Sequence, residues 1–306
     1  YTSCKDNREY LVSSNNDNYR LDIIALLDNK LILSLKGHDN HIRTIRYFIN
    51  NNNHTEYLIS ADNDIIVIVW EITNNYNLKY KITTQYGDNI YSCLLLFDLF
   101  NDKNYIITSS YCQSDEKEKS ATKIYSLDNG QFIKHIEYTN KNAIYYLLSW
   151  YNQRNNKYYI IQFAFKEIII TNLLEDELYG EFMQEPEDNH LSGFIYQKEN
   201  IDYLVTSAYN GYIHVWDLYE KKISKVINTN ECVLCHIIEW NNKYAIVADY
   251  NNKSFKIIDI EEGKVVKDIS GKHTDKVACV KKIYHPVYGE SLLTAGQDNI
   301  IKLWIL

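Results

Sequence analysis

The chain has 306 residues, a formal net charge of −8 at pH 7 and an isoelectric point near 5.6. A chain of this length can bury a sizeable core, and its negative charge disfavours nonspecific binding to the phosphate backbone of nucleic acids. Tyrosine occurs 28 times, whereas proline occurs 2 times and methionine 1 time, and β-branched and aromatic residues fill the apolar runs. This composition favours strands over helices.

Cysteines and apolar runs set the expectations for compartment and membrane. The 6 cysteines follow no framework spacing. A chain this long does not need disulfides, so we expect the cytoplasm or another reducing compartment. The longest apolar runs, such as CLLLFDLF and IIVIVW, are much shorter than the roughly 18 to 20 residues that cross a bilayer. We therefore expect no membrane insertion.

In chain order, the sequence repeats one strand pattern. A core of one tyrosine or serine, aliphatic residues and then small or hydroxyl residues occurs seven times, at intervals of 41 to 54 residues. Each core is followed by a second apolar run and preceded by a third, and a more polar run separates the units. The seven cores start at Tyr10, Tyr57, Tyr105, Tyr159, Tyr203, Tyr244 and Ser291.

Four short strands repeated seven times are typical of radially arranged sheets, in which each blade buries its faces against its neighbours. We therefore predict an all-β fold, a seven-bladed β-propeller of four-stranded antiparallel blades that forms one domain over residues 1–306. The run before each core is the predicted inner strand, and the polar run is the predicted outer strand. The approximate blades are residues 1–35, 36–81, 82–136, 137–182, 183–227, 228–269 and 270–306.

Three stretches share a hydroxyl residue ten places before a tryptophan: SADNDIIVIVW from Ser60, TSAYNGYIHVW from Thr206 and TAGQDNIIKLW from Thr294. With Gly37–His38 before the first, the chain resembles the WD-repeat β-propeller family, whose repeats begin with Gly-His and end with Trp-Asp. The resemblance implies a buried hydrogen-bonded set in each complete blade. These sets are His38, Ser60, Asp64 and Trp70 in the second unit, and His273, Thr294, Asp298 and Trp304 in the seventh.

We expect these sets to be structural. Linking the buried groups avoids a cost of about 1 to 3 kcal/mol for each unpaired one. The other units depart from the pattern. The fifth has Asn210 in place of the aspartate and no histidine at the expected position, and we place Leu27, Tyr125, Thr171 and Ile258 where tryptophan would stand in the first, third, fourth and sixth. Packing must hold those blades.

The sequence predicts no catalytic residues, no cofactor and no metal site. Phosphate, dinucleotide, zinc-protease and hydrolase signatures are absent, and a set that occurs twice at repeat spacing does not fit one catalytic triad. The CVLC stretch at Cys232–Cys235 has no second pair to complete a zinc site. Aligning the inner strands puts Cys235 beside Thr44, Ser92, Gly193 and Cys279, so we expect a small buried thiol.

The resemblance implies a rigid, non-enzymatic scaffold that binds other proteins. Partner contacts are expected at the residue before each inner strand and at the residue before the aspartate of the turn after each core. These candidates are His41, Asn89, Lys276, Asn63, Tyr209 and Gln297. The alternatives are recognition of a peptide or modified tail at the central channel and, third, an enzymatic propeller with charged residues in that channel.

Two longer loops, residues 113–120 and 175–190, should open on the same face. The acidic second loop is either a solvated linker or a docking patch for a basic partner. The last blade ends without an outer strand, and few residues precede Tyr10. We therefore expect the natural chain to extend upstream of Tyr1, to supply that strand, and to belong to a larger protein or assembly.

Overall fold

A computed structural model describes residues 1–3, 6–15, 17–50, 54–63, 65–73, 75–84, 89–98, 103–112, 119–137, 143–164, 166–175, 177–183, 189–230 and 233–305. Every regular element in these ranges is a β-strand, and neighbouring strands pair in antiparallel fashion. The alternation of buried and exposed residues, for example in β4 and β19, is what the repeated apolar runs predicted.

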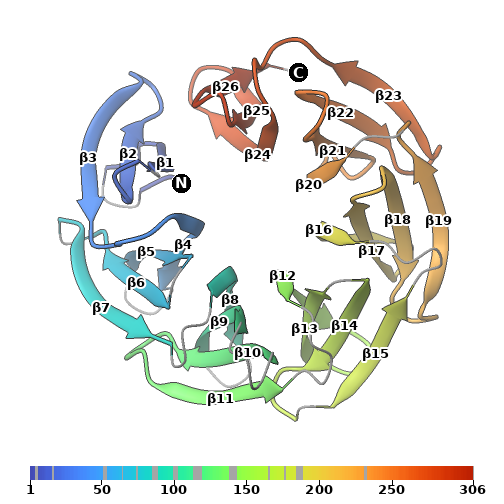
Figure 1. Cartoon of the computed structure of the whole chain (residues 1–306), viewed down its shortest axis with the longest axis horizontal. Coiled ribbons are helices and arrows are strands. Elements are labelled where there is room, and N and C mark those ends of the chain that lie inside the picture. The colour runs from blue at the N-terminus through green and yellow to red at the C-terminus, as the bar shows by residue number, and fades with distance from the viewer. Residues whose placement is uncertain are drawn as a thin grey trace. The chain divides into compact units, whose positions relative to one another are not determined.

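The strands form seven sheets in chain order (Figure 1). The first three blades contain β1 (Tyr10–Asn15), β2 (Arg20–Ala25) and β3 (Lys30–Lys36); β4 (Ile42–Asn50), β5 (Thr55–Asp62), β6 (Ile66–Glu71) and β7 (Asn77–Thr83); and β8 (Asn89–Asp98), β9 (Lys103–Cys112), β10 (Lys119–Ser126) and β11 (Phe132–Glu137). The fourth contains β12 (Ile144–Asn152), β13 (Lys157–Ala164), β14 (Glu167–Asn172) and β15 (Leu178–Met183).

The last three blades follow the same order. They contain β16 (His190–Lys198), β17 (Ile201–Ala208), β18 (Tyr212–Asp217) and β19 (Lys222–Asn228); β20 (Leu234–Trp240), β21 (Tyr244–Asp249), β22 (Ser254–Asp259) and β23 (Lys264–Ile269); and β24 (Val277–His285), β25 (Gly289–Gly296) and β26 (Ile301–Trp304). In the described residues the first and last sheets have three strands, and a bridge from Thr2 to Glu9 precedes β1. The predicted all-β, seven-bladed β-propeller is confirmed.

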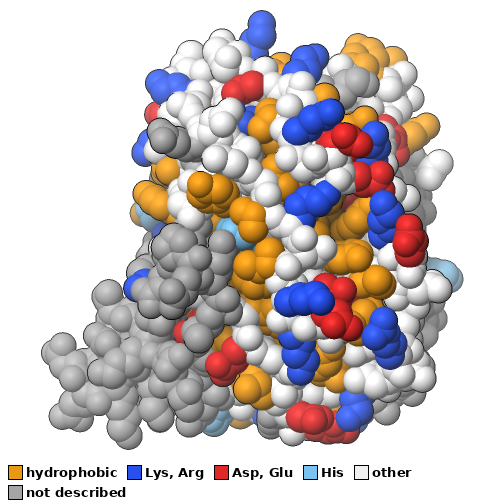
Figure 2. Space-filling model, turned by 90° about the vertical axis from the view of Figure 1, so that its right-hand side faces the viewer, with side chains coloured by type: hydrophobic (Ala, Val, Ile, Leu, Met, Phe, Trp, Pro, Cys, Tyr) orange, Lys and Arg blue, Asp and Glu red, His pale blue; other side chains and the backbone are white. Residues whose placement is uncertain are grey.

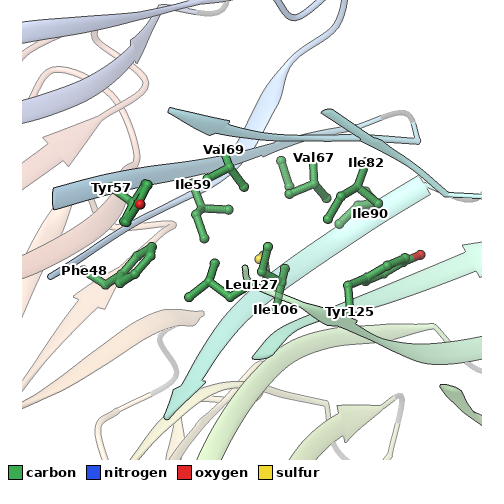
Figure 3. Packing of buried hydrophobic residues seen from close by; sticks show 12 residues of the cluster. Phe48, Tyr57, Ile59, Val67, Val69, Ile82, Ile90, Ile106, Tyr125 and Leu127 are labelled. Carbon is green, nitrogen blue, oxygen red and sulfur yellow. The ribbon is translucent and has the colours of Figure 1, made fainter. Parts of the chain in front are cut away.

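By its internal contacts the chain divides into two compact units, Tyr1–Ser149 (unit 1) and Trp150–Leu306 (unit 2). In unit 1, one apolar cluster joins the facing sheets of blades one and two, through residues such as Leu21, Ile23 and Trp70. A second cluster joins blades two and three, where Ile59 and Val69 face Ile106 and Tyr125 (Figure 3). Burial of these faces is the main favourable term in the packing.

Unit 2 is built in the same way. One cluster joins blades five and six through Val205, Val215 and Val247, and another joins blades six and seven through Phe255 and Leu292. The inner strand β20 contacts β16 on one side and β24 on the other. Consecutive blades within each unit are therefore locked by aliphatic and aromatic side chains from both neighbours.

A β-bulge near the start of the inner strand recurs in β4, β8, β16, β20 and β24. The extra residue shifts the side chains that follow to the opposite face. After the bulge, Thr44, Ser92 and Cys279 hold equivalent positions, each paired with the residue after the hydroxyl position of the core strand. The equivalents in blades five and six are Ser192 and His236. The predicted alignment of Gly193 and Cys235 in this column was wrong by one residue.

The register also tests the residues placed at the tryptophan position. Trp70 pairs with Leu58, and the equivalent pairings put Tyr125, Thr171 and Ile258 at that position, as predicted. In blade one the equivalent pair is Leu11 with Ile24, so the placement of Leu27 was wrong. Leu27 follows β2 in the next turn, and its side chain is 60% exposed.

Candidate interaction surface

The histidine-centred set of blade two links the start of the blade to its second and third strands. His38 lies with Nδ1 2.8 Å from Oδ2 of Asp62 and Nε2 2.6 Å from Oγ of Ser60, and the indole of Trp70 donates to the same Oγ at 3.0 Å. All four side chains are buried. Among the described residues the carboxylate at the ring is that of Asp62, and the predicted Asp64 lies outside the described residues.

Blade seven brings the predicted residues together. His273 Nε2 lies 2.7 Å from Oγ1 of Thr294, its Nδ1 lies 2.9 Å from Oδ2 of Asp298, and Trp304 donates to Thr294 at 2.8 Å. Burial raises the pKa of Asp298, but hydrogen bonds from the backbone N–H of Thr274 and from His273 outweigh it and lower that pKa. The carboxylate is therefore held ionised as an acceptor.

Blade five keeps only the indole–hydroxyl part of the set. Trp216 donates to Oγ1 of Thr206 at 3.0 Å, while Asn210 accepts from the backbone N–H of Tyr212. Beside this tryptophan lie two histidines, His190 and His214, whose ring centroids are 5.1 Å apart. Both are almost fully buried, and Nδ1 of His190 and both ring nitrogens of His214 have no hydrogen-bond partner among the described residues.

Desolvation by burial lowers the pKa of His190 to about 3 and that of His214 to about 4, and for His190 the neighbouring ring adds to the effect. Both imidazoles are therefore neutral near pH 7. By register, the two histidines occupy the positions of Ile42 and Ile68 in blade two. The sequence signal that could have found them is this replacement of two aliphatic residues by histidine.

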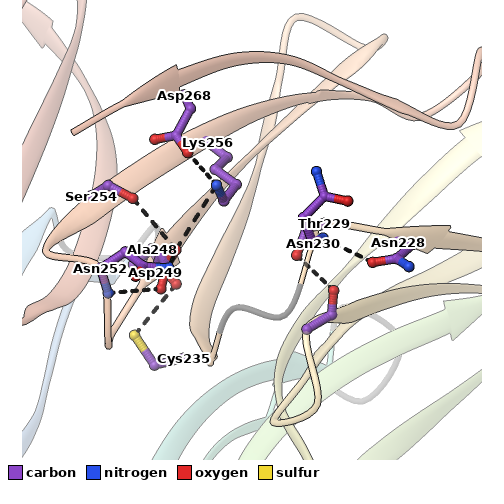
Figure 4. Close-up of polar contacts among 11 residues, drawn as sticks. Asn228, Thr229, Asn230, Cys235, Ala248, Asp249, Asn252, Ser254, Lys256 and Asp268 are labelled. Carbon is purple, nitrogen blue, oxygen red and sulfur yellow. Dashed lines mark hydrogen bonds and ion pairs between the residues drawn. The ribbon is translucent and has the colours of Figure 1, made fainter.

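In blade six a lysine, and not a histidine, lies beside the buried aspartate. Asp249, fully buried at the position equivalent to Asp62, accepts from the backbone N–H and side-chain amide of Asn252 and from Ser254 (Figure 4). Lys256 lies 3.9 Å from Asp249 and forms a closer ion pair with Asp268 of the outer strand. Three strands of this blade are joined by the buried Lys256 and its carboxylate partners rather than by an indole.

Blade four is joined to blade five through a carboxylate. Trp150, on the inner strand β12, donates its indole N–H to Oδ2 of Asp202 at 2.9 Å, and the hydroxyl of Tyr219 donates to the same oxygen at 2.7 Å. Gln197 donates to the other oxygen at 2.7 Å. Asp202 is 2% exposed, so all three donors depend on one buried acceptor. Within blade four, Gln162 donates to Thr171 at 3.1 Å.

The sets around His38, His273 and Asp202 are buried and mutually paired, which fits a structural role better than catalysis. In the described part of the chain, no group of three or more His, Cys, Asp or Glu side chains is placed to hold a metal ion. Cys235 donates to the backbone oxygen of Val277 at 3.2 Å, and its pKa rises to about 12, chiefly by burial and then by the nearby Cys279. This thiol is protonated and poorly nucleophilic at neutral pH. Cys232 lies outside the described residues.

One backbone contact recurs in four of the sheets, at the end where the inner strand begins. The N–H of the residue that follows the core strand donates to the carbonyl of the residue before the inner strand. The pairs are Asn63 to His41 at 2.8 Å, Tyr209 to Asn189 at 2.9 Å, Tyr250 to Val233 at 2.8 Å and Gln297 to Lys276 at 2.8 Å. Asn89 pairs with Tyr111 in the equivalent place.

We call these residues the turn-end set. It includes all six candidate contacts, among which Tyr209 is the most prominent apolar side chain, with 55% of its surface exposed. In unit 2 the set contains a cluster that the sequence analysis missed. The ammonium group of Lys276 lies 4.4 Å from the ring centroid of Tyr250, and Gln297 donates to the hydroxyl of Tyr250 at 2.9 Å. Alignment of the blade-six turn with the others would have identified Tyr250.

In unit 1, Asn63 accepts a hydrogen bond from Arg43 at 3.0 Å, and His41 meets Tyr19 edge to face, with ring centroids 5.4 Å apart. Aromatic, amide and basic side chains therefore occur in the turn-end set of both units. Such side chains are suited to protein recognition, because one flat group gives both apolar area and a polar contact. Most of the loop at residues 113–120 and the central part of that at residues 175–190 lie outside the described residues.

Comparison with known proteins agrees with this geometry. Residues 29–71 and 263–304 match the family model described as "WD domain, G-beta repeat", and these ranges contain the sets around His38 and His273. A search of curated proteins gives no match. Within the described residues, no helix has the length and apolar character needed to span a bilayer. The two repeat matches and the seven-bladed fold together support a place for the chain in the WD-repeat family.

Proposed function

We propose that this protein is a non-enzymatic scaffold that binds other proteins through the turn-end set. WD-repeat propellers generally bind proteins, and the fold fits that role. The observation that carries the proposal is the repeated hydrogen bond between the two turn residues in successive blades. It holds side chains of different chemistry in equivalent, rigid positions, which lowers the entropic cost of binding.

The cluster of Tyr250, Lys276 and Gln297 is the strongest part of this surface in unit 2. Its tyrosine offers apolar area, and its lysine and amide offer donors. Tyr209, at the equivalent position of the neighbouring blade five, adds an exposed aromatic group to the half-buried Tyr250. We expect a partner that contributes aliphatic side chains and carbonyl or carboxylate acceptors.

The experiment compares partners recovered with the tagged chain and with a Tyr209→Ala/Tyr250→Ala variant, measured by affinity purification and quantitative mass spectrometry. We expect the specific partners to decrease at least about tenfold, the effect of losing one binding hot spot. The matched control is Tyr288→Ala, because Tyr288 is 53% exposed in the hairpin at the opposite end of its sheet. Equal recovery by all three forms, or recovery of none, would contradict the proposal.

We also propose a reducing compartment. Cys93, Cys235 and Cys279, the cysteines with described side chains in these units, are free thiols. Burial raises the pKa of Cys93 to about 12, which makes it resistant to oxidation. Fractionation of cells with an antibody to the chain tests this proposal, and recovery from an oxidising secretory fraction would overturn it.

A further inference from the structure

The outer strands of unit 1 present apolar side chains to solvent at one level of three successive blades. Leu31, Leu78 and Phe132 each pair with the residue at the tryptophan position of their blade, and they are 49%, 44% and 55% exposed. Ile32 and Ile133 follow in the bulges of β3 and β11 and are 45% and 47% exposed. We call these five residues the rim stripe.

The three outer strands are neighbours. Lys81 on β7 donates to the carbonyl of Gly37, the residue after β3, at 2.8 Å. On the other side, the hydroxyl of Tyr80 donates to the carbonyl of Leu127, in the turn before β11. That turn contains Gly130, whose φ is 73° and where an added Cβ would lie 2.9 Å from the ring of Tyr80. The rim stripe is therefore a run across adjoining blades, held in place by side chains that bridge them.

Charge distinguishes this rim from that of unit 2. The turns and outer strands of unit 1, residues 26–36, 72–83 and 127–137, carry five lysines against three Asp or Glu, a balance of +2. The equivalent residues of unit 2, 173–183, 218–228 and 260–269, carry five lysines against eight Asp or Glu, a balance of −3. The chain as a whole has a net charge of −8. The rim of unit 1 is therefore positively charged in a chain whose net charge is negative.

The lysines of the two rims also differ in their ion pairs with carboxylates. In unit 2, Lys222 lies 3.6 Å from Glu220 and Lys264 lies 3.7 Å from Glu262. Figure 2 shows Lys, Arg, Asp and Glu side chains next to one another on the side where β19 and β23 lie in Figure 1. In unit 1, counting the described residues alone, Lys30, Lys36, Lys79 and Lys81 form no ion pair.

We propose that the rim stripe binds an acidic, extended segment of a partner protein. Each outer strand has one edge without a partner strand among the described residues, which offers N–H and C=O groups to an added strand. The exposed aliphatic and aromatic residues would contact its alternate side chains, and the lysines would pair with its carboxylates. The same lysines repel an identical edge from a second copy, so an acidic partner is favoured over self-association.

This surface lies on the sides of the blades, away from the turn-end set, so the inference goes beyond the proposed function and does not depend on it. The probe is a synthetic ten-residue peptide that alternates glutamate with valine, and the control peptide has lysine in place of glutamate. Binding to the full chain is measured by fluorescence anisotropy at low and high salt. Amide hydrogen exchange then locates the protected strands.

We expect the acidic peptide to bind, to protect amides of β3, β7 or β11, and to bind at least about tenfold more weakly in high salt. Lys30→Glu/Lys36→Glu should weaken it by a similar factor, and Leu31→Ser/Ile32→Ser should do the same through lost apolar contact. The matched control, Val226→Ser/Val266→Ser, removes side chains that are 45% and 52% exposed on the outer strands of unit 2 and should leave the affinity unchanged.

The two pairs of unit 1 variants separate the effect of charge from that of folding, because Lys30 and Lys36 are exposed and form no described contact that the fold requires. Equal binding of the two peptides, an equal loss in the unit 2 control, or the absence of protection on these strands would overturn the inference. Tyr209→Ala/Tyr250→Ala should bind the acidic peptide like the unmodified chain. A failure of the turn-end proposal is thereby distinguished from a failure of this one.

Discussion

Blades two and five have the same strand register, yet their buried interiors are stabilised in different ways. In blade two, His38 joins Asp62 to Ser60, and each of these buried groups has a partner. In blade five the hydroxyl–indole bond of Thr206 and Trp216 remains, but two histidines replace the isoleucines of blade two. Three of their ring nitrogens have no hydrogen-bond partner in the described part of the chain. The propeller thus fixes positions and allows their chemistry to vary from blade to blade.

The two blades also differ in whether their buried hydrogen bonds stay within one blade or reach a neighbouring one. The histidine-centred set of blade two lies within that blade, whereas blade five shares Asp202 with Trp150 of blade four. Loss of a residue of the first set should act on one blade, while loss of the shared acceptor should act on two. Three measurements of stability test this comparison.

The largest effect concerns the buried histidines. Because their folded-state pKa values, about 3 and about 4, lie below the ordinary value of 6.5, the unfolded chain binds protons that the folded chain does not. The free energy of unfolding should therefore fall as the pH drops from 6.5 towards 4. Between pH 7 and pH 5 we expect a loss of about 4 kcal/mol from the pair.

His190→Ile/His214→Ile, which restores the residue types of blade two, should remove this loss. Urea unfolding at pH 7, 6 and 5 measures it in the unmodified chain and in the variant. The two curves should diverge as the pH falls, with the variant more stable at pH 5. Parallel curves would show that the histidines are not buried in the neutral form.

The second effect concerns the shared carboxylate. Asp202→Ala removes the acceptor of Trp150, Tyr219 and Gln197, and we expect a loss of about 3 kcal/mol because buried donors are left unpaired. Asp202→Asn keeps one acceptor oxygen and should lose less. Chemical unfolding gives both values, and fluorescence of Trp150 reports the local change. A loss under about 1 kcal/mol in the alanine variant would refute a coupling role.

The smallest effect concerns the histidine-centred set of blade two. His38→Ala leaves Asp62 and Ser60 without their ring partner, and we expect a loss of about 2 kcal/mol in the free energy of unfolding. His41→Ala is the control, since His41 is exposed three residues later and should change the stability by about 0.5 kcal/mol or less. If the two variants lost equal stability, the hydrogen-bonded set would not be what stabilises blade two.

The predictions from sequence succeeded where they depended on periodicity. The period of the cores predicted the strand order and the seven blades, and counting from each core placed Tyr125, Thr171 and Ile258 correctly. Leu27 was misplaced because Leu27–Asp28 looks like the Trp-Asp ending, whereas the β1–β2 pairing puts Ile24 there. A dipeptide carries less information than strand register.

The choice of buried partners was harder to predict. The repeat pattern did not single out Asp62, the last residue of β5, whose carboxylate lies beside the His38 ring. Cys235 and Gly193 were misaligned because the inner strands contain a bulge, which no composition rule places to the residue. Tyr250 of blade six contacts Lys276 and Gln297 of blade seven. An alignment of the repeats can place Tyr250 in its turn, but it does not show contacts between two blades.

By itself the sequence determined the class of protein, because strand pattern and repeat period are local properties that survive the loss of individual motif residues. It also determined the resemblance to WD repeats and the existence of two complete sets. Tertiary structure alone decided that Asp62 meets His38, that Lys256 pairs with Asp268, and that Lys222 and Lys264 lie beside carboxylates on the rim of unit 2. The physical reason is that a one-residue bulge reverses the face of a side chain, and pairing across blades joins residues far apart in the chain.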